Sequence, residues 1–134
     1  MNKSSQIRKF LTSPVFGVVG ASNRREKFGN KILRCYLENN LRAIPVNPAE
    51  TMIEGIDCVQ SVSDLPEEVN SISIITPPQI TDKVVELAIE KGIGNIWMQP
   101  GAESPMAVAL CQSRGVNLIY GGTCLLVELG FPDH

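Results

Sequence analysis

The sequence predicts an α/β protein, a doubly wound, Rossmann-like three-layer sandwich with a mainly parallel sheet of about five strands. Short apolar runs rich in β-branched residues alternate with amphipathic segments of ten or more residues. Strands joined by such long crossovers run parallel, and right-handed crossovers place helices on both faces of the sheet. Neither a repeat nor a linker interrupts the 134 residues, so we expect one domain over residues 1–134.

The first half of the chain predicts two helices and two strands. Residues 4–14 carry apolar side chains at helical spacing and end at a proline. Residues 15–20, "VFGVVG", are typical of a strand buried on both faces, and residues 30–40 form an amphipathic helix. A second strand over residues 42–48 contains Pro45, which cannot donate a ladder hydrogen bond and therefore favours an edge position.

Residues 49–70 are less regular. A strand within "MIEGIDCV" is weakly indicated, and Ser63 is expected to cap one short helix in "SDLPEEV". The remaining pattern is clearer, because proline and glycine mark the ends of its helices. It predicts strands over residues 71–76, 95–101 and 117–122, and helices over residues 77–92 and 103–115.

Composition excludes several functional classes. The net charge of −2 argues against a general nucleic-acid binder, which is usually basic. No apolar stretch approaches the roughly 18 to 20 residues of a membrane span, and "MNKSSQIRK" lacks the apolar region of a signal peptide, so we expect a cytoplasmic protein.

Cysteine and histidine usage indicates neither a metal site nor a disulfide framework. The four cysteines form no C-x-x-C pair and are expected to be reduced thiols. The single histidine, His134, is the last residue, which makes histidine-dependent catalysis or metal ligation unexpected. Cys35 and Trp97 are expected to pack in the core.

The loop after the first strand is a candidate anion site. Gly20 lets a ligand approach the backbone, and the loop leads to a helix whose N-terminal amides attract anions. Arg24, Arg25 and Lys27 add local positive charge suited to a phosphate. The alternative is a glycine turn with a solvated charge cluster.

Two features argue against a nicotinamide dinucleotide as the ligand. Gly17, Gly20 and Gly29 are separated by two and eight residues and do not form G-x-G-x-x-G. The second strand ends in Asn47 and Pro48, where a ribose-binding enzyme would carry Asp or Glu. A phosphorylated or otherwise different nucleotide is easier to accommodate.

Proline and glycine also dominate the ends of the other predicted strands, in "VNP", "TPP", "QPGA" and "YGGTC". Prolines fix the backbone and present flat apolar walls, while glycines leave room and free amides, as a pre-formed cleft requires. For each loop taken alone, an ordinary βα turn is the alternative. Four such loops on one side of the sheet favour the cleft.

These motifs together resemble the small single-domain CoA-binding proteins, relatives of the CoA-binding domain of the succinyl-CoA synthetase alpha subunit. The resemblance covers roughly residues 10–128 and rests on "GVVGAS", "KFGNKILRCYLENN", "IPVNP", "SISIITPP", "NIWMQPGA" and the cysteine after the last strand. It implies an NAD-like fold whose ligand is coenzyme A or an acyl-CoA.

The resemblance also implies roles for individual residues. Ala21, Ser22 and Asn23 after Gly20 would hold the CoA phosphates, and Asn47 and Pro48 would line the adenosine end. The residues that would border the rest of the cleft and the pantetheine arm are Thr76, Pro77, Pro78, Gln99, Pro100 and Gly101.

Two departures limit what the resemblance implies. Ligase relatives carry a phosphorylated catalytic histidine on a further domain, so ligase activity is not implied. Small relatives often have a charged residue before the cysteine that follows the last strand, whereas here Thr123 precedes Cys124. A Cys124 thiol facing the cleft could form a mixed disulfide with CoA; a buried one would be inert. Glu103 and Glu128 are scattered acids rather than a catalytic pair.

The expected function is therefore non-enzymatic binding of CoA or an acyl-CoA, with the basic loop or Arg42 contacting the 3′-phosphate. One alternative is an NAD(P)-linked enzyme or enzyme remnant that needs a partner for its substrate domain. Another is a regulatory subunit that forms a homodimer through the C-terminal "LLVELGF".

Overall fold

The computed structural model describes residues 1–132, and its centre is a five-stranded sheet in the order β2-β1-β5-β6-β7, parallel throughout. The strands are β1 (Val15–Val19), β2 (Arg42–Val46), β5 (Ser71–Ile74), β6 (Asn95–Met98) and β7 (Asn117–Ile119). The helices are α1 (Lys3–Leu11), α2 (Phe28–Glu38), α3 (Pro78–Lys91), α4 (Pro105–Ser113) and α5 (Leu125–Glu128).

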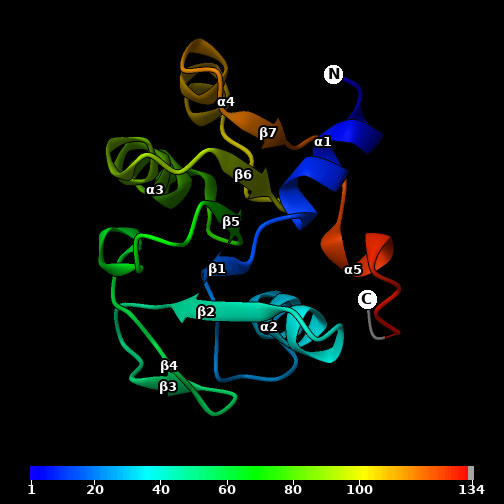
Figure 1. Cartoon of the computed structure of the whole chain (residues 1–134). Helices are drawn as coiled ribbons and strands as arrows, with labels where there is room; N and C mark the ends of the chain where they lie inside the picture. The colour runs from blue at the N-terminus through cyan, green and yellow to red at the C-terminus, as the bar shows by residue number, and fades with distance from the viewer. Residues whose placement is uncertain (133–134) are drawn as a thin grey trace.

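Helices cover both faces of the sheet (Figure 1). Helices α3 and α4 pack on one face and bury a cluster that includes Ile72, Val85 and Ile96. Helices α1, α2 and α5 pack on the other face around Phe16 and Tyr36. The predicted three-layer, doubly wound fold is confirmed, and the predicted edge position of Pro45 is confirmed because β2 ends the sheet.

The face under α1, α2 and α5 contains an aromatic core. The Phe16 ring stacks on Tyr36 at 4.6 Å and on Phe10 at 5.3 Å, and Trp97 meets the Phe10 ring edge-on. The Tyr36 hydroxyl is 2.6 Å from Ser73 Oγ, which satisfies the one polar atom of a ring that is fully buried. Cys35 is also fully buried, and burial raises the pKa of its thiol to about 12. Both Trp97 and Cys35 are core residues, as predicted.

Residues 49–70 agree with the prediction in part, because strand structure occurs within "MIEGIDCV". They form a hairpin of two-residue strands, β3 (Met52–Ile53) and β4 (Ile56–Asp57), joined by Glu54 and Gly55, which both have positive φ. A 3-10 helix, η1 (Val62–Asp64), replaces the predicted short helix. Its cap is Ser61 rather than Ser63, because the Ser61 side chain accepts the Ser63 N–H.

Helix α1 covers the outer edge of β7 with side-chain hydrogen bonds. Gln6 Nε2 donates to the Leu118 carbonyl at 3.0 Å, and Lys3 Nζ donates to the Tyr120 carbonyl at 2.7 Å. In return, Asn117 Nδ2 donates to the Gln6 carbonyl. The exposed backbone acceptors of this edge are thereby satisfied from within the chain.

The C-terminal segment packs into the chain's own core. Leu125, Leu126 and Phe131 are buried, Leu129 is half-buried, and Val127 is 56% exposed. The predicted self-association through "LLVELGF" stays a prediction, and Val127 is the exposed large apolar side chain that the described part of this segment offers to it. His134 lies outside the described residues.

Candidate functional site

A pocket lies at the carboxyl ends of β1, β2 and β5, where the sheet order reverses direction. From β1 the chain passes to β2 on one side of it, and the later strands β5, β6 and β7 follow on the other side. Open α/β sheets bind ligands at such a switch point. The pocket has a volume of about 270 Å³ and is lined by Val19, Gly20, Val46, Asn47, Pro48, Gln60, Ser61, Val62, Thr76, Ile80, Lys83, Val84 and Leu87.

Four residues predicted from strand ends meet in this pocket: Gly20, Asn47, Pro48 and Thr76. The prediction missed the wall that α3 contributes through an apolar stripe whose first member, Ile80, is 50% exposed. Spacing at i, i+4 and i+7 indicated an apolar face on this helix, but a stripe that lines a pocket has the same spacing as one that packs on the sheet.

Two glycines allow the end of β1 to approach its neighbours closely. Gly20 has φ +97°, and a Cβ there would lie 2.7 Å from the Ile75 carbonyl oxygen. A Cβ on Gly29 would lie 2.0 Å from the Gly20 carbonyl oxygen, which no side chain tolerates. The first turn of α2 is therefore held directly against the end of β1.

No side chain caps the N-terminus of α2. Its cap residue Lys27 supplies no side-chain hydrogen bond. Within the part of the chain that the structure describes, the N–H groups of Phe28, Gly29 and Asn30 donate to no acceptor. Unsatisfied amides at a helix start carry partial positive charge and favour an anion.

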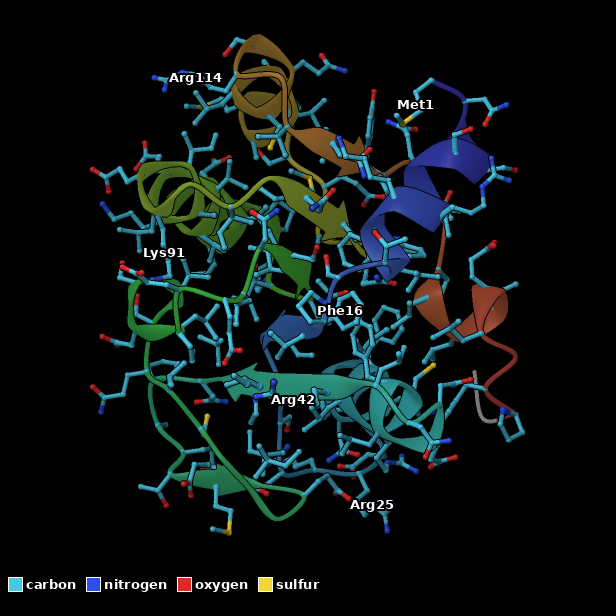
Figure 2. All side chains as sticks on the ribbon, in the orientation of Figure 1. Met1, Phe16, Arg25, Arg42, Lys91 and Arg114 are labelled. Atoms are coloured by element: carbon cyan, nitrogen blue, oxygen red, sulfur yellow. The ribbon has the colours of Figure 1, made fainter. Side chains whose placement is uncertain are left out.

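Side chains of the β1–α2 loop are partly held by carboxylates of the β2–β4 segment. Asn23 Nδ2 donates to the Glu50 carboxylate and, at 3.0 Å, to the Met52 carbonyl. Arg25 Nε lies 3.6 Å from Glu54 Oε2, and the Arg25 side chain is 65% exposed at the outer edge of the molecule (Figure 2). These contacts link the loop to the hairpin.

The remaining basic residues of the loop are free of such contacts. The side chains of Arg24 and Lys27 are exposed and form no ion pair among the described residues. Ser22 Oγ accepts the Arg24 N–H at 3.0 Å, which shapes the turn. Ser22, Asn23, Arg24, Arg25 and Lys27 do not line the pocket; they lie beside it on the way to α2.

Asn47 connects the end of β2 to this loop. Its Nδ2 donates to the carbonyl of the buried Ala21 at 2.8 Å, and its Oδ1 accepts the Ala49 N–H at 2.8 Å. The amide thus fixes both the loop and the turn that carries Pro48. An acidic residue at position 47 could not donate to the Ala21 carbonyl.

The loop after β5 is joined closely to the start of α3. Pro77 caps α3 and Pro78 is its first residue, where a missing N–H is harmless. Thr76 Oγ1 lies 2.8 Å from Thr81 Oγ1, which anchors the loop to the first turn of α3. Thr76 contributes to the pocket, whereas Pro77 and Pro78 stay outside its lining.

Gln99 joins the loops after β6 and β7. Its side chain is fully buried, and Oε1 accepts the Leu125 N–H at 3.0 Å. Its Nε2 is buried without an acceptor among the described residues. Gln99, Pro100 and Gly101 do not line the pocket and lie one strand further along the same edge.

The Glu103 carboxylate is enclosed by backbone donors from the same two loops. Oε1 accepts the Gly101 N–H at 2.8 Å, and Oε2 accepts the N–H groups of Gly121 and Gly122 at 3.3 Å and 3.2 Å. Partial burial raises the pKa of Glu103, but hydrogen bonds from backbone N–H groups outweigh it and the net pKa is lowered. Glu103 thus connects the loops after β6 and β7 through hydrogen bonds.

Cys124 caps α5 and is half-buried against the apolar cluster that contains Cys35. It lies at the carboxyl end of β7, outside the pocket lining. Arg42 begins β2, at the opposite end of that strand from Asn47, and its guanidinium lies 3.6 Å from Glu68. The geometry therefore separates Arg42 from the pocket, against the expectation that it contacts a ligand phosphate.

Within residues 1–132, no group of three or more His, Cys, Asp and Glu side chains is placed to hold a metal ion. No helix in this range is both long enough and apolar enough to cross a membrane.

Known proteins resemble this chain in sequence and in structure. Residues 15–130 match the model of a family described as a CoA binding domain. A conserved hypothetical protein from Pyrococcus furiosus has a similar structure, with a TM-score of 0.81 and 38% identity over 84% of this chain and 97% of that one.

Two curated ligases are also similar. An ADP-forming acetate–CoA ligase of Methanocaldococcus jannaschii is 30% identical over 63% of this chain, and another of Archaeoglobus fulgidus is 28% identical over 83% of it. This chain spans only 12% and 18% of their respective lengths.

Proposed function

The chain belongs to the CoA binding domain family, and from this premise we propose that it binds coenzyme A or an acyl-CoA without transforming it. The observation that carries the proposal is the pocket at the switch point, which lies beside the uncapped N-terminus of α2. The pocket suits the nucleoside, and the helix start suits the diphosphate.

The pocket lining fits an adenosine. Pro48 and the apolar stripe of α3 form flat walls, and a few polar groups such as Asn47 and Thr76 surround them. Its volume of about 270 Å³ is slightly below the ~300–1,000 Å³ typical of a site that encloses a whole ligand. We infer that it holds the base and ribose while the rest of the ligand extends along the sheet edge.

The diphosphate lies at the start of α2 in this proposal. The free N–H groups of Phe28, Gly29 and Asn30 would donate to it, and Arg24 and Lys27 are close in sequence with no competing ion pair among the described residues. Asn23 and Arg25 would have to exchange the hairpin carboxylates for phosphate oxygens.

The pantetheine arm follows the carboxyl ends of β5 and β6 toward Cys124. The sheet order places the loops containing Pro77, Pro100 and Cys124 along one edge. From β1 to β7 there are three strand spacings, or about 14 Å. The thiol end would thus reach the region of the β7 loop.

Two other activities have less support. Proteins that bind a dinucleotide with a free ribose diol carry an acidic residue at the end of the second strand, where this chain has Asn47. Ligase activity belongs to proteins of which this chain matches only a small part, and the pocket lining carries no histidine, cysteine or carboxylate among the described residues.

Calorimetric titration with CoA and NAD tests the proposal directly. We expect saturable binding of CoA and none of NAD; binding of NAD without CoA would overturn the proposal. The paired substitutions Arg24→Ala and Arg25→Ala should raise the CoA Kd by about 5- to 150-fold if the guanidinium groups contact phosphates.

The matched control is Arg114→Ala, an exposed arginine at the end of α4 on the far side of the molecule (Figure 2). It should leave the Kd unchanged. A CoA Kd that is equally unaffected by both sets of substitutions would assign Arg24 and Arg25 to the solvated surface.

A further inference from the structure

The switch-point pocket has a single charged side chain in its described lining, that of Lys83. Lys83 lies on α3 between Ile80 and Val84, so its stem borders the apolar stripe that forms one wall. The side chain is 70% exposed and lies at the boundary between this pocket and the groove between α3 and α4, since it lines both.

The ammonium of Lys83 is available to a ligand. Its one ion pair is with Glu86, at 3.7 Å and one turn along the same helix, and both side chains are mostly exposed. Exposed i,i+3 pairs of this kind contribute little and exchange readily. Glu86 and Glu90 line the neighbouring groove between α3 and α4 but not the pocket, whereas Lys83 lines both.

Other cations of the chain are poorly placed to serve this pocket. Arg24, Arg25 and Lys27 lie on the β1–α2 loop outside the lining, and Arg42 lies at the opposite end of β2. A second anionic group on a bound nucleoside, separate from the diphosphate at α2, therefore has Lys83 as its cationic partner.

Two neutral side chains that can donate hydrogen bonds, those of Gln60 and Ser61, line the same pocket as Lys83. Gln60 is exposed and its amide forms no hydrogen bond among the described residues, while Ser61 uses its oxygen as an acceptor from the Ser63 N–H and keeps its own proton to donate. A cation with hydroxyl and amide donors is a suitable environment for a phosphate monoester.

We propose that Lys83 binds a phosphate carried on the ribose of the ligand and makes the pocket selective for a 3′-phosphorylated adenosine. This rests on the proposed function, because it assumes that the adenosine of CoA occupies the pocket. It replaces the expected phosphate contact of Arg42. It also divides recognition between two sites, with the diphosphate at the start of α2 and the ribose phosphate at α3.

The test is a comparison of CoA with dephospho-CoA, which lacks only the 3′-phosphate, by calorimetric titration of the whole chain. The wild-type protein should bind CoA about tenfold more tightly than dephospho-CoA, as expected for one partly screened charge-assisted contact. Lys83→Met, which keeps the apolar stem, should lose this preference by weakening CoA binding while leaving the dephospho-CoA Kd within about twofold. Lys83→Arg should retain it.

Lys91→Met is the matched control, because Lys91 ends the same helix, lies outside the pocket lining and donates a hydrogen bond to the Ser63 carbonyl at 3.4 Å. The Lys91→Met variant should keep the wild-type preference for CoA; Lys91 is labelled in Figure 2. Thermal melts of each variant check that the fold is retained.

The outcomes separate the two proposals. Equal wild-type affinity for CoA and dephospho-CoA would overturn the role of Lys83 and leave CoA binding standing. A Lys83→Met variant that loses affinity for both ligands in equal measure would also overturn it, since this indicates packing rather than phosphate contact. Failure of both ligands to bind the wild-type chain would overturn the proposed function itself.

Discussion

Replacing Glu103 by Gln should loosen the connection between the β6 and β7 loops. The carboxylate accepts three backbone N–H groups, from Gly101, Gly121 and Gly122. Glutamine keeps one carbonyl oxygen but points an NH₂ group at the remaining donors, so at least one hydrogen bond is lost together with the charge.

The size of the effect follows from these contacts. Each hydrogen bond to a charged group contributes about 1.5–3 kcal/mol, but Glu103 is only partly buried and two of its three contacts exceed 3.1 Å. We therefore expect a loss of about 1–2 kcal/mol in the free energy of unfolding. For 134 residues, an unfolding entropy of about 2.1 cal/mol/K per residue converts this loss to about 4–7 °C in Tm.

The pH dependence of the difference is a second signature. The folded-state pKa of Glu103 lies below its ordinary value of 4.5. A depressed carboxyl pKa stabilises the fold above the unfolded-state pKa, and this contribution is lost as pH falls through the folded-state pKa. The Tm difference between wild type and Glu103→Gln should be full at pH 7 and should shrink below about pH 4.5.

Thermal unfolding followed by circular dichroism between pH 3 and pH 7 measures both quantities. Glu67→Gln is the control, because Glu67 is an exposed carboxylate without a hydrogen bond or ion pair among the described residues. A Glu103→Gln variant with the wild-type Tm at pH 7, or a Tm difference that does not change with pH, would refute the role of this carboxylate in connecting the two loops.

Three further substitutions test the site. Gly29→Ala places a Cβ 2.0 Å from the Gly20 carbonyl oxygen, so α2 must shift. We expect the free energy of unfolding to fall by more than about 2 kcal/mol and calorimetry to detect no CoA binding. A variant with the wild-type Tm and Kd would show that the close approach is dispensable. Asn47→Ala removes the bond from its Nδ2 to the loop carbonyl and should cost about 1–2 kcal/mol in urea unfolding and weaken CoA binding; unchanged values for both would contradict its role. Glu54→Gln releases Arg25 from its ion pair and should lower the CoA Kd by about two- to fivefold; a higher Kd would mean that the pair positions the loop for the ligand.

Most of the fold could be predicted because its strands and helices carry strong local signals. Five short β-branched runs became the five strands of the sheet, and the proline and glycine at the ends of α3 gave its limits to within a residue. The β3–β4 hairpin could not be predicted with confidence, because two-residue strands are too short to show alternation. Helix α5 was not predicted either, because its four residues are too few to show helical periodicity.

The candidate site was predicted where it depends on strand ends and missed where it depends on tertiary contacts. Gly20, Asn47 and Thr76 follow strands directly, so parallel topology brings them together. The pocket wall from α3 could not be distinguished from a core-facing stripe. Nor could the sequence show that Glu50 and Glu54 hold Asn23 and Arg25, because these partners meet only once the hairpin has folded back.

The covering of β7 by α1 has a consequence for how copies of this chain meet one another. Gln6 and Lys3 occupy carbonyls that would otherwise recruit a strand from another molecule, and Pro45 interrupts the donors at the opposite border of the sheet. Replacing both Lys3 and Gln6 by Ala would strip one border of its protection while leaving Phe10 in the aromatic core. The doubly substituted chain would therefore be more prone to edge-to-edge association of sheets than the intact one.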